Sequence, residues 1–193
     1  MSIIIDDLGK RLGARLRAER EERGWSLTDL AGRAGVSRAT INNIERGLTS
    51  PTAALLGKLS GAFGLTMSTL LARAEAAQAG RLLRAAEQPV WRDPKSGYVR
   101  RHVAPAPGSD LPLDVVKVEM PPGAEVAFPA ASYVFIRQIV WIVSGELEIR
   151  EGETLHRLLP GDSLEFGAPD DCRFANPGAE PCVYAVIVLR TER

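Results

Sequence analysis

The sequence changes character between residues 75 and 89. Before this segment, apolar residues recur at spacings of three and four, the pattern of helices that bury one face. After it, proline and glycine repeatedly interrupt short apolar or alternating runs, a pattern typical of strands joined by turns. A chain of 193 residues is long enough to form two cores. We therefore predict an all-α domain at residues 1–74, a helical or flexible linker at 75–88 and an all-β domain at 89–193.

Five helices are expected in the first domain. The apolar stripe of the first helix consists of Ile5, Leu8, Leu12 and Leu16. Ser26 and Ser37 are predicted N-caps of the second and third helices, because their side chains accept hydrogen bonds from free amide groups at a helix start. Gly35 ends the second helix and lies in the turn between the two. Thr52 and Ser68 mark the starts of the fourth and fifth helices.

The second domain is expected to consist of short strands. The candidates are residues 114–120, 133–143, 146–151, 163–166 and 182–189, together with a strand that begins at Cys172. Many short strands separated by turn residues indicate an all-β barrel or sandwich.

Charge is unevenly distributed, although the formal net charge is zero. Residues 1–75 carry 11 Lys and Arg against 8 Asp and Glu, whereas the remainder carries 13 against 16. The amino-terminal part is therefore the expected partner of a polyanion. No apolar run approaches the roughly 18 residues of a transmembrane helix, and acidic residues stand where a secretory signal would be basic. We expect a cytoplasmic protein with no membrane partner, in which both cysteines are thiols.

Residues 24–47, GWSLTDLAGRAGVSRATINNIERG, contain two short helices and a glycine turn. Such a turn lets two helices cross steeply, the arrangement in which the second helix lies in a DNA major groove. The stretch resembles the lambda-repressor-like helix-turn-helix family, also called the Xre family, and the resemblance extends to about residue 71. It is carried by the Leu-x-x-Leu-Ala pattern, the Gly-Val-Ser turn, the Ile-x-x-Ile-Glu-x-Gly helix end and the following Pro-Thr.

The resemblance implies that the amino-terminal half of the third helix faces DNA bases. Base contacts are implied for Arg38, Ala39 and Asn43, with Asn42 as an addition. Arginine pairs well with guanine, asparagine with adenine, and alanine with a thymine methyl group. Phosphate contacts are implied for Ser26, Ser37, Thr40 and Arg46.

Two further positions match the family. Arg20 and Glu45 correspond to an ion pair that braces the first helix against the third. Trp25 is interpreted as a core or hinge aromatic residue. The alternative for the helical domain is a bundle that binds only proteins, since a fold does not fix a function; the polar and basic exposed face expected on the third helix favours DNA.

Residues 110–190 resemble a cupin, a small barrel of two sheets also called a double-stranded β-helix. The second cupin motif is matched by Gly161, Gly167, Pro169, Cys172 and Asn176, with proline and glycine exchanged. Cys172 stands where the family has a histidine.

The first cupin motif is matched more weakly. Gln138 occupies the glutamate position, counted back from Gly145, and the segment contains no histidine. Ser132 and Val134 fit the two histidine positions best. Cupin enzymes bind a divalent metal through imidazoles and a carboxylate. One thiol and one amide do not replace these ligands, so we expect no metal, no cofactor and no catalytic residues.

A barrel of this size is either packed or keeps a pocket for one small ligand. Strand alternation from Gln138 places Val134, Ile136, Val140 and Ile142 on one face and Tyr133, Phe135, Arg137 and Trp141 on the other. One face lines the barrel, and the other is available for packing or a subunit interface. The predicted ligand pocket consists of Ser132, Val134, Gln138, Cys172, Phe174 and Tyr184. A filled core without a ligand is the alternative.

Cys172 follows Asp170 and Asp171, whose charge raises the pKa of a thiol unless an arginine compensates. This favours an inert thiol over a redox sensor. Cys182 lies in an apolar strand and is interpreted as a buried, small hydrophobic residue.

A helix-turn-helix domain followed by a cupin resembles bacterial one-component regulators. The resemblance implies a sequence-specific DNA-binding transcriptional regulator that is not an enzyme. The cupin is its expected small-molecule sensor and dimerisation platform, acting on the DNA-binding units through the linker. The expected partners are double-stranded DNA with a pseudo-palindromic operator, a second copy of the chain and a small-molecule effector. The alternatives are a metal-dependent cupin enzyme fused to a DNA-binding domain and a cupin that only dimerises.

Overall fold

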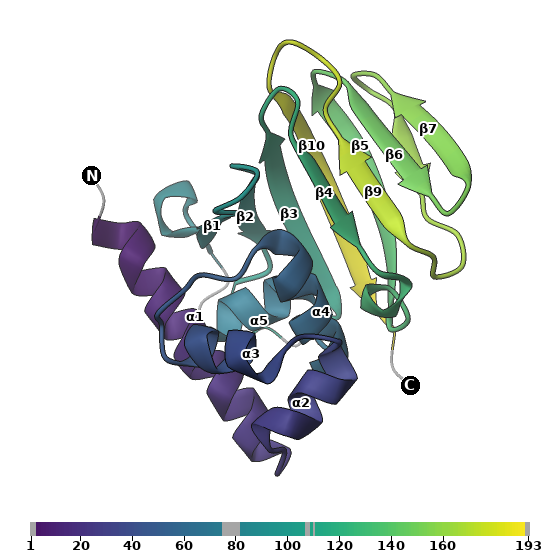
Figure 1. The fold of residues 1–193 in the computed structure, drawn as a ribbon. Coiled ribbons are helices and arrows are strands. Elements are labelled where there is room, and N and C mark those ends of the chain that lie inside the picture. Colours follow the sequence, from purple (N-terminus) through teal and green to yellow (C-terminus); the bar gives the residue numbers. More distant parts are fainter. Residues whose placement is uncertain (1–2, 75–81, 107–108, 110, 192–193) are drawn as a thin grey trace.

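The computed structural model describes residues 3–74, 82–106, 109 and 111–191, and it consists of a helical part and a β barrel (Figure 1). The helices are α1 Ile3–Glu22, α2 Leu27–Ala34, α3 Arg38–Glu45, α4 Ala53–Phe63 and α5 Met67–Ala74. The five helices expected from the sequence are thus confirmed. Leu12 and Leu16 of the predicted stripe are buried, whereas the side chains of Ile5 and Leu8 lie outside the described residues.

The predicted helix starts are confirmed by the hydrogen bonds at their caps. Ser26 forms a capping box with Asp29, and the Ser37 side chain accepts a hydrogen bond from the amide of Thr40. Gly35 ends α2 in the left-handed conformation, with φ of 60°, which glycine adopts without steric cost. The fifth helix begins at Met67, one residue before the predicted start at Ser68.

No single helix among the described residues is long and apolar enough to cross a membrane; α4 and α5 meet that test of length and composition only together, as a pair bent by 92°.

Among the described residues, the barrel consists of ten strands in two antiparallel sheets. They are β1 Val90–Arg92, β2 Val99–Ala104, β3 Leu113–Met120, β4 Glu125–Phe128, β5 Ile136–Ser144, β6 Leu147–Glu151, β7 Thr154–Leu158, β8 Ser163–Glu165, β9 Cys172–Ala175 and β10 Cys182–Arg190. One sheet has the order β1-β2-β3-β10-β5-β8, and the other has the order β4-β9-β6-β7. The six predicted strands correspond to β3, β5, β6, β8, β9 and β10, whereas β1, β2, β4 and β7 were not predicted.

Side chains from both sheets fill the centre of the barrel. On β5, Val140 and Ile142 are 0% exposed, as the predicted alternation requires. An aromatic group crosses between the sheets, because the ring of Phe174 lies 5.9 Å from that of Phe128 and 6.3 Å from that of Tyr184. Such packing of large rings accounts for much of the apolar area that the barrel buries.

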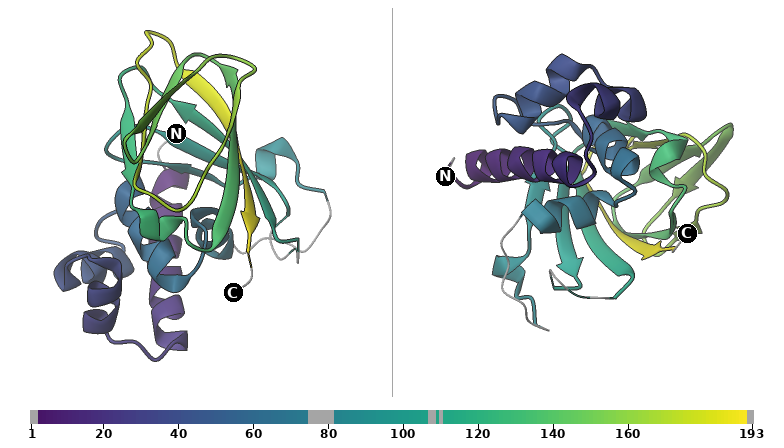
Figure 2. Two further views of the ribbon diagram at one scale, coloured as in Figure 1. Left: turned by 90° about the vertical axis from the view of Figure 1, so that its right-hand side faces the viewer. Right: turned by 90° about the horizontal axis from the view of Figure 1, so that it is seen from below.

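The helices gather at one end of the barrel, where α4 packs on β4 and on the short 3-10 helix η2 Ala130–Ser132 (Figures 1 and 2). Gly57 and Gly61 allow this close approach. A Cβ atom on Gly57 would lie 2.8 Å from Phe128 Cδ1, and one on Gly61 would lie 3.2 Å from the carbonyl oxygen of Ala131. Residues four apart share one helix face, so α4 presents these glycines to the barrel.

Polar contacts also join the two parts. The amide of Ala53, at the start of α4, donates to Asp93 Oδ1 at 3.1 Å. Just before α5, Thr66 Oγ1 donates a hydrogen bond of 2.8 Å to Asp114 Oδ2. Within α5, Thr69 Oγ1 accepts a hydrogen bond of 3.1 Å from Arg190. Both α4 and α5 are therefore held by the barrel. Of the predicted linker, residues 75–81 lie outside the described residues, and residues 82–88 contain the 3-10 helix η1 Ala85–Glu87.

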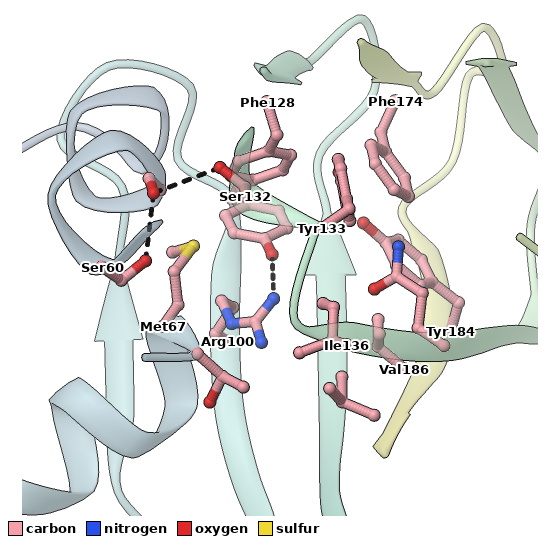
Figure 3. Close-up of a pocket in the computed structure, with 15 residues that line it drawn as sticks. Ser60, Met67, Arg100, Phe128, Ser132, Tyr133, Ile136, Phe174, Tyr184 and Val186 are labelled. Atoms are coloured by element: carbon pink, nitrogen blue, oxygen red, sulfur yellow. Dashed lines mark hydrogen bonds between the residues drawn. The ribbon is translucent and has the colours of Figure 1, made fainter. Parts of the chain in front are cut away.

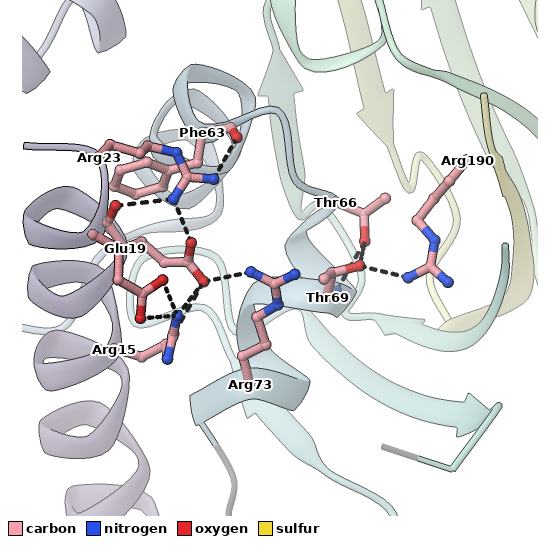
Figure 4. A network of polar contacts seen from close by, with 9 residues as sticks. Arg15, Glu19, Arg23, Phe63, Thr66, Thr69, Arg73 and Arg190 are labelled. Atoms are coloured by element: carbon pink, nitrogen blue, oxygen red, sulfur yellow. Dashed lines mark hydrogen bonds and ion pairs between the residues drawn. The ribbon is translucent and has the colours of Figure 1, made fainter. Parts of the chain in front are cut away.

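Glu19 joins α1 to α5 (Figure 4). Its carboxylate is 0% exposed and lies within 2.7 Å of a guanidinium nitrogen of each of Arg15, Arg23 and Arg73. Burial raises the pKa of Glu19, but hydrogen bonds from Arg73, Arg23 and Arg15 lower it by more, to about 2. Arg15 and Arg23, whose side chains are 23% and 27% exposed, thus belong to a network between helices and are not isolated surface charges.

Candidate nucleic-acid interface and ligand cavity

Helix α3 has one face in the core and one face open to solvent. Ile41 and Ile44 are each 1% exposed and fix the helix against its neighbours. The predicted DNA-contacting residues lie away from them: Ser26, Ser37, Arg38, Ala39, Asn43 and Arg46 are exposed, and Thr40 and Asn42 are half-buried. The structure therefore brings these eight residues to the surface of α3 and of the α2 start.

The hydroxyl groups among these residues already cap helices. Ser26 Oγ lies 2.7 Å from Asp29 Oδ2, and Ser37 Oγ lies 2.7 Å from Thr40 Oγ1. These contacts position the first turns of α2 and α3, where free amide groups and the helix dipole attract phosphate.

An internal ion pair braces α3, as the sequence predicts. Arg20 binds Glu45 with two hydrogen bonds, of 2.7 Å from Nε and 2.8 Å from a terminal nitrogen. A third hydrogen bond, of 2.9 Å, joins Arg20 to the carbonyl oxygen of Trp25. The Trp25 ring stacks on Phe63 at 5.8 Å and lies 4.3 Å from the Arg33 guanidinium. Trp25 is thus a partly buried packing residue, as predicted.

A cavity lies where the helices meet the barrel (Figure 3). Its volume is about 60 Å³, counted as the space open to the centre of a water molecule. The helical part contributes Gly57, Ser60, Thr66 and Met67, and the barrel contributes Tyr98, Arg100, Phe128, Ser132, Tyr133, Ile136, Gln138, Phe174, Tyr184, Val186 and Val188. The cavity wall therefore belongs to both domains.

Four of the six residues predicted for the pocket line this cavity: Ser132, Gln138, Phe174 and Tyr184. Val134 does not, because its side chain is 55% exposed. The predicted alternation fails there because β5 begins only at Ile136, and residues 133–135 form a turn after η2. Tyr133, which was assigned to the outer face, lines the cavity instead, and Phe135 is buried.

Cys172, the other residue predicted for the pocket, does not line the cavity either. It is 2% exposed and lines a smaller hollow next to the cavity, shared with Tyr133 and Gln138. Burial raises the pKa of the thiol to about 11, and Glu151, Asp170 and Asp171 add to the increase. Since the thiolate is the reactive form, this environment is that of an inert thiol.

Arg100 and the helical residues of the cavity were missed by the sequence analysis. Arg100 lies on β2, in the basic run VRRHV, none of whose residues was assigned to the pocket from the sequence. The available signal was the alternation of Tyr98, Arg100 and His102, which places the three side chains on one face of a strand. In the structure Tyr98 and His102 are buried on that face. The contribution of α4 and α5 had no sequence signal beyond the spacing of Gly57 and Gly61.

The residues at the cupin metal positions do not fit a metal. In the part of the chain that the structure describes, no group of three or more His, Cys, Asp and Glu side chains is arranged to hold an ion. His102 Nε2 lies 2.6 Å from the carbonyl oxygen of Pro105. His156 Nε2 lies 3.7 Å from Glu151. A catalytic divalent ion needs three or four such ligands together.

Residues 16–70 match the helix-turn-helix family HTH_3. The helical part also resembles the HTH-type transcriptional regulator SutR from Escherichia coli, with 37% identity over 73 residues, or 38% of this chain and 41% of SutR. It resembles SinR from Bacillus subtilis with 39% identity over 61 residues, or 31% of this chain and 55% of SinR. The chain thus spans about half the length of these relatives, and the match to HTH_3 is confined to residues 16–70 of the helical part.

The whole fold has a counterpart among solved structures. An HTH_3 family transcriptional regulator from Vibrio cholerae superimposes with a TM-score of 0.79, covering 97% of this chain and 99% of the other, at 22% identity. At that identity the similarity concerns the fold. The predicted order and type of the two parts are confirmed: an all-α helix-turn-helix part is followed by an all-β barrel of two sheets.

Proposed function

We propose that this protein is a sequence-specific DNA-binding transcriptional regulator, acting without catalysis and controlled by a small molecule in the barrel cavity. Two copies would bind a pseudo-palindromic operator in double-stranded DNA, in the cytoplasm. The observation that carries the proposal is the exposed face of α3, which lies within the residues that match HTH_3.

This face has the side chains that base reading requires. Arg38 and Asn43 offer guanidinium and amide groups, and Ala39 offers a methyl group. The face is rigid, because Ile41 and Ile44 fix α3 in the core and Arg20 holds Glu45 at its end. Rigid presentation keeps these groups at the geometry of a base edge at a low entropic cost.

Control by a ligand is supported by the shared cavity wall. Ser60 of α4 and Met67 of α5 face the same space as Gln138 and Phe174 of the barrel. A molecule in the cavity therefore contacts the DNA-binding domain directly. We propose α4 and α5, in place of the linker, as the route by which the ligand shifts the protein between arrangements of different DNA affinity.

Dimerisation is supported by an apolar outer face on the six-stranded sheet. On β5, Ile139, Trp141 and Val143 are 42%, 49% and 50% exposed. Ile187 and Ala185 of β10 lie directly opposite Ile139 and Trp141, which extends the apolar face to the next strand. A regulator with one reading helix per chain needs a two-fold partner to recognise two half-sites, and we assign this face, Ile139, Trp141, Val143, Ala185 and Ile187, to that contact.

The DNA-binding part is tested with an operator selected from random duplexes by the wild-type protein. In gel-shift titration, Arg38→Ala and Asn43→Ala are each expected to weaken binding about ten- to hundredfold, the value of one good base contact. Arg157→Ala is the control, because Arg157 is 77% exposed on the barrel strand β7. Unchanged affinity in both α3 variants, with unchanged unfolding midpoints, would contradict the proposal.

The enzymatic alternative is tested by elemental analysis of the purified chain. We expect no metal in stoichiometric amount, because the cupin metal positions hold Gln138 and Cys172 in place of glutamate and histidine. Stoichiometric iron, manganese, nickel or zinc would favour a cupin enzyme.

A further inference from the structure

The cavity contains a positive charge, Arg100, that forms no ion pair among the described residues. An acidic influence on it comes from the buried carboxylate of Asp114, which lies outside the cavity lining. Arg100 donates from one terminal nitrogen to the Tyr98 hydroxyl and from the other to Ser68 Oγ, each at 3.0 Å. Its third nitrogen, Nε, is buried, and the N–H group there has no hydrogen-bond partner. Within the described residues no ion pair includes Arg100, and the cavity lining contains neither aspartate nor glutamate.

Gln138 supplies a second donor without an acceptor. Its side chain is 7% exposed, and its Nε2 amide group is buried without a partner. Gln138 lines the same cavity as Arg100. A buried donor left without an acceptor has a free-energy cost comparable to a lost hydrogen bond, and an unpaired charge costs more. Two such groups at one cavity indicate that the acceptor arrives from outside.

The remaining wall is largely apolar. Phe128, Phe174, Ile136 and Val186 all line it (Figure 3). A ligand that suits this wall has an apolar body, because apolar contact removes hydrocarbon surface from water on both sides.

We infer that the cavity binds a small organic carboxylate, with its oxygen atoms on Arg100 and Gln138 and its apolar body against Phe128 and Phe174. The planar guanidinium fork matches carboxylate geometry. One guanidinium balances one negative charge, so a phosphate dianion would leave a charge unpaired. Amines are excluded, because the lining has no carboxylate to receive them. This inference rests on the proposed function and names the chemical class of its effector.

Arg100 also connects the ligand to the DNA-binding domain. The guanidinium that would hold the carboxylate already donates to Ser68, in the first turn of α5. A carboxylate that competes for this guanidinium changes the contact between β2 and α5. The ligand head group therefore acts at a contact between the two domains.

Binding is measured on the full chain, without DNA, by titration calorimetry and by the unfolding midpoint. The probes are straight-chain carboxylates from acetate to octanoate and phenylacetate, each beside its neutral amide of the same shape. We expect one or more carboxylates to raise the midpoint saturably, and each binder to exceed its amide at least tenfold in affinity. If no carboxylate binds better than its amide, the inference is overturned.

Variants separate the site from general anion binding. Arg100→Gln is expected to weaken binding of the tightest carboxylate about ten- to hundredfold, as for a hydrogen bond between charged groups. Arg101→Gln is the matched control, because this neighbour donates outside the cavity, to the carbonyl oxygen of Ala85. If Arg100→Gln unfolds, Gln138→Leu provides the second variant and is expected to weaken binding as well. Equal affinity in wild type and a folded cavity variant would contradict the assignment.

Failure of this inference is distinguishable from failure of the proposed function. Carboxylate binding is measured without DNA, whereas operator binding is measured without a ligand. An operator-binding protein that ignores every carboxylate would overturn the ligand class alone. A protein that binds a carboxylate through Arg100 but shows no sequence-specific DNA binding would retain the site and contradict the regulatory role.

Discussion

The hydroxyl of Ser132 donates a hydrogen bond of 3.2 Å to the carbonyl oxygen of Gly57. The same carbonyl accepts a hydrogen bond of 3.1 Å from Ser60. All three residues line the cavity (Figure 3). The contact that joins α4 to the barrel is therefore also part of the ligand-facing wall, so the fit of the two domains and the occupancy of the cavity are physically coupled.

The first prediction concerns the close approach at Gly57. In Gly57→Ala the new Cβ meets Phe128 Cδ1 at 2.8 Å, so the helix or the ring must move. We expect a loss of about 1–3 kcal/mol in the free energy of unfolding, typical of overpacking, measured by denaturant titration.

Gly32→Ala is the matched control. Gly32 lies within α2, and a Cβ atom there has no neighbour within 4 Å. This substitution is expected to stabilise the chain by about 0.5–1 kcal/mol, because alanine favours a helix more than glycine does. Equal effects of the two substitutions would show that α4 does not pack on the barrel as described.

The second prediction concerns Glu19 and acid stability. The pKa of Glu19 is about 2 in the fold, against an ordinary value of 4.5, because burial is outweighed by Arg73, Arg23 and Arg15. A lowered pKa stabilises the fold above pH 4.5, and this stabilisation is lost as pH falls from there through about 2. The shift of the Glu19 pKa from 4.5 to about 2 corresponds to about 3 kcal/mol in the free energy of unfolding at neutral pH.

Glu19→Gln isolates this contribution. The variant is expected to be less stable than wild type at pH 7, and the gap should close as pH falls below 4.5. Glu21→Gln serves as the control, since Glu21 pairs with Arg17 at the surface, where ion pairs contribute little. A gap between wild type and Glu19→Gln that stays constant down to pH 2 would contradict the lowered pKa.

The helical domain could be predicted from the sequence because its signals are local. The Ser26 capping box, Gly35 in the left-handed turn and the Ile41–Ile44 spacing each act within a few residues. Strands with strong apolar alternation were found for the same reason. The basic strand β2 was missed, because its charged residues hide an alternation that is meaningful only once the partner strands are known.

The cavity could be predicted only in part. Ser132 and Gln138 came from the resemblance to the first cupin motif, and Phe174 from strand alternation after Cys172, which is again a local rule. Arg100 and the residues of α4 and α5 join them through contacts between distant segments, such as the hydrogen bond between Ser132 and Gly57. No spacing along the chain records such a contact.

The third prediction tests the redox alternative for Cys172. Both thiols are buried, and burial raises the pKa of each to about 11. We expect neither to react with a disulfide reagent at pH 7.5 in the native protein, and both to react after denaturation. Cys172→Ser and Cys182→Ser assign any reaction to one site. Rapid labelling of Cys172 in the native state would support a redox sensor instead.

The last prediction concerns the apolar outer face formed by Ile139, Trp141, Val143, Ala185 and Ile187. Trp141 lies near its centre and is 49% exposed in the single chain. If a second copy covers this face, light scattering should give twice the chain mass of 20.9 kDa. In Trp141→Lys the dimer should dissociate, because a charge would be buried without a partner, and operator affinity should fall with it. Leu155→Lys, at an exposed apolar position on the other sheet, should remain a dimer. A monomeric wild-type chain would contradict the proposed dimer. A Trp141→Lys dimer of unchanged stability would assign the dimer contact to another face.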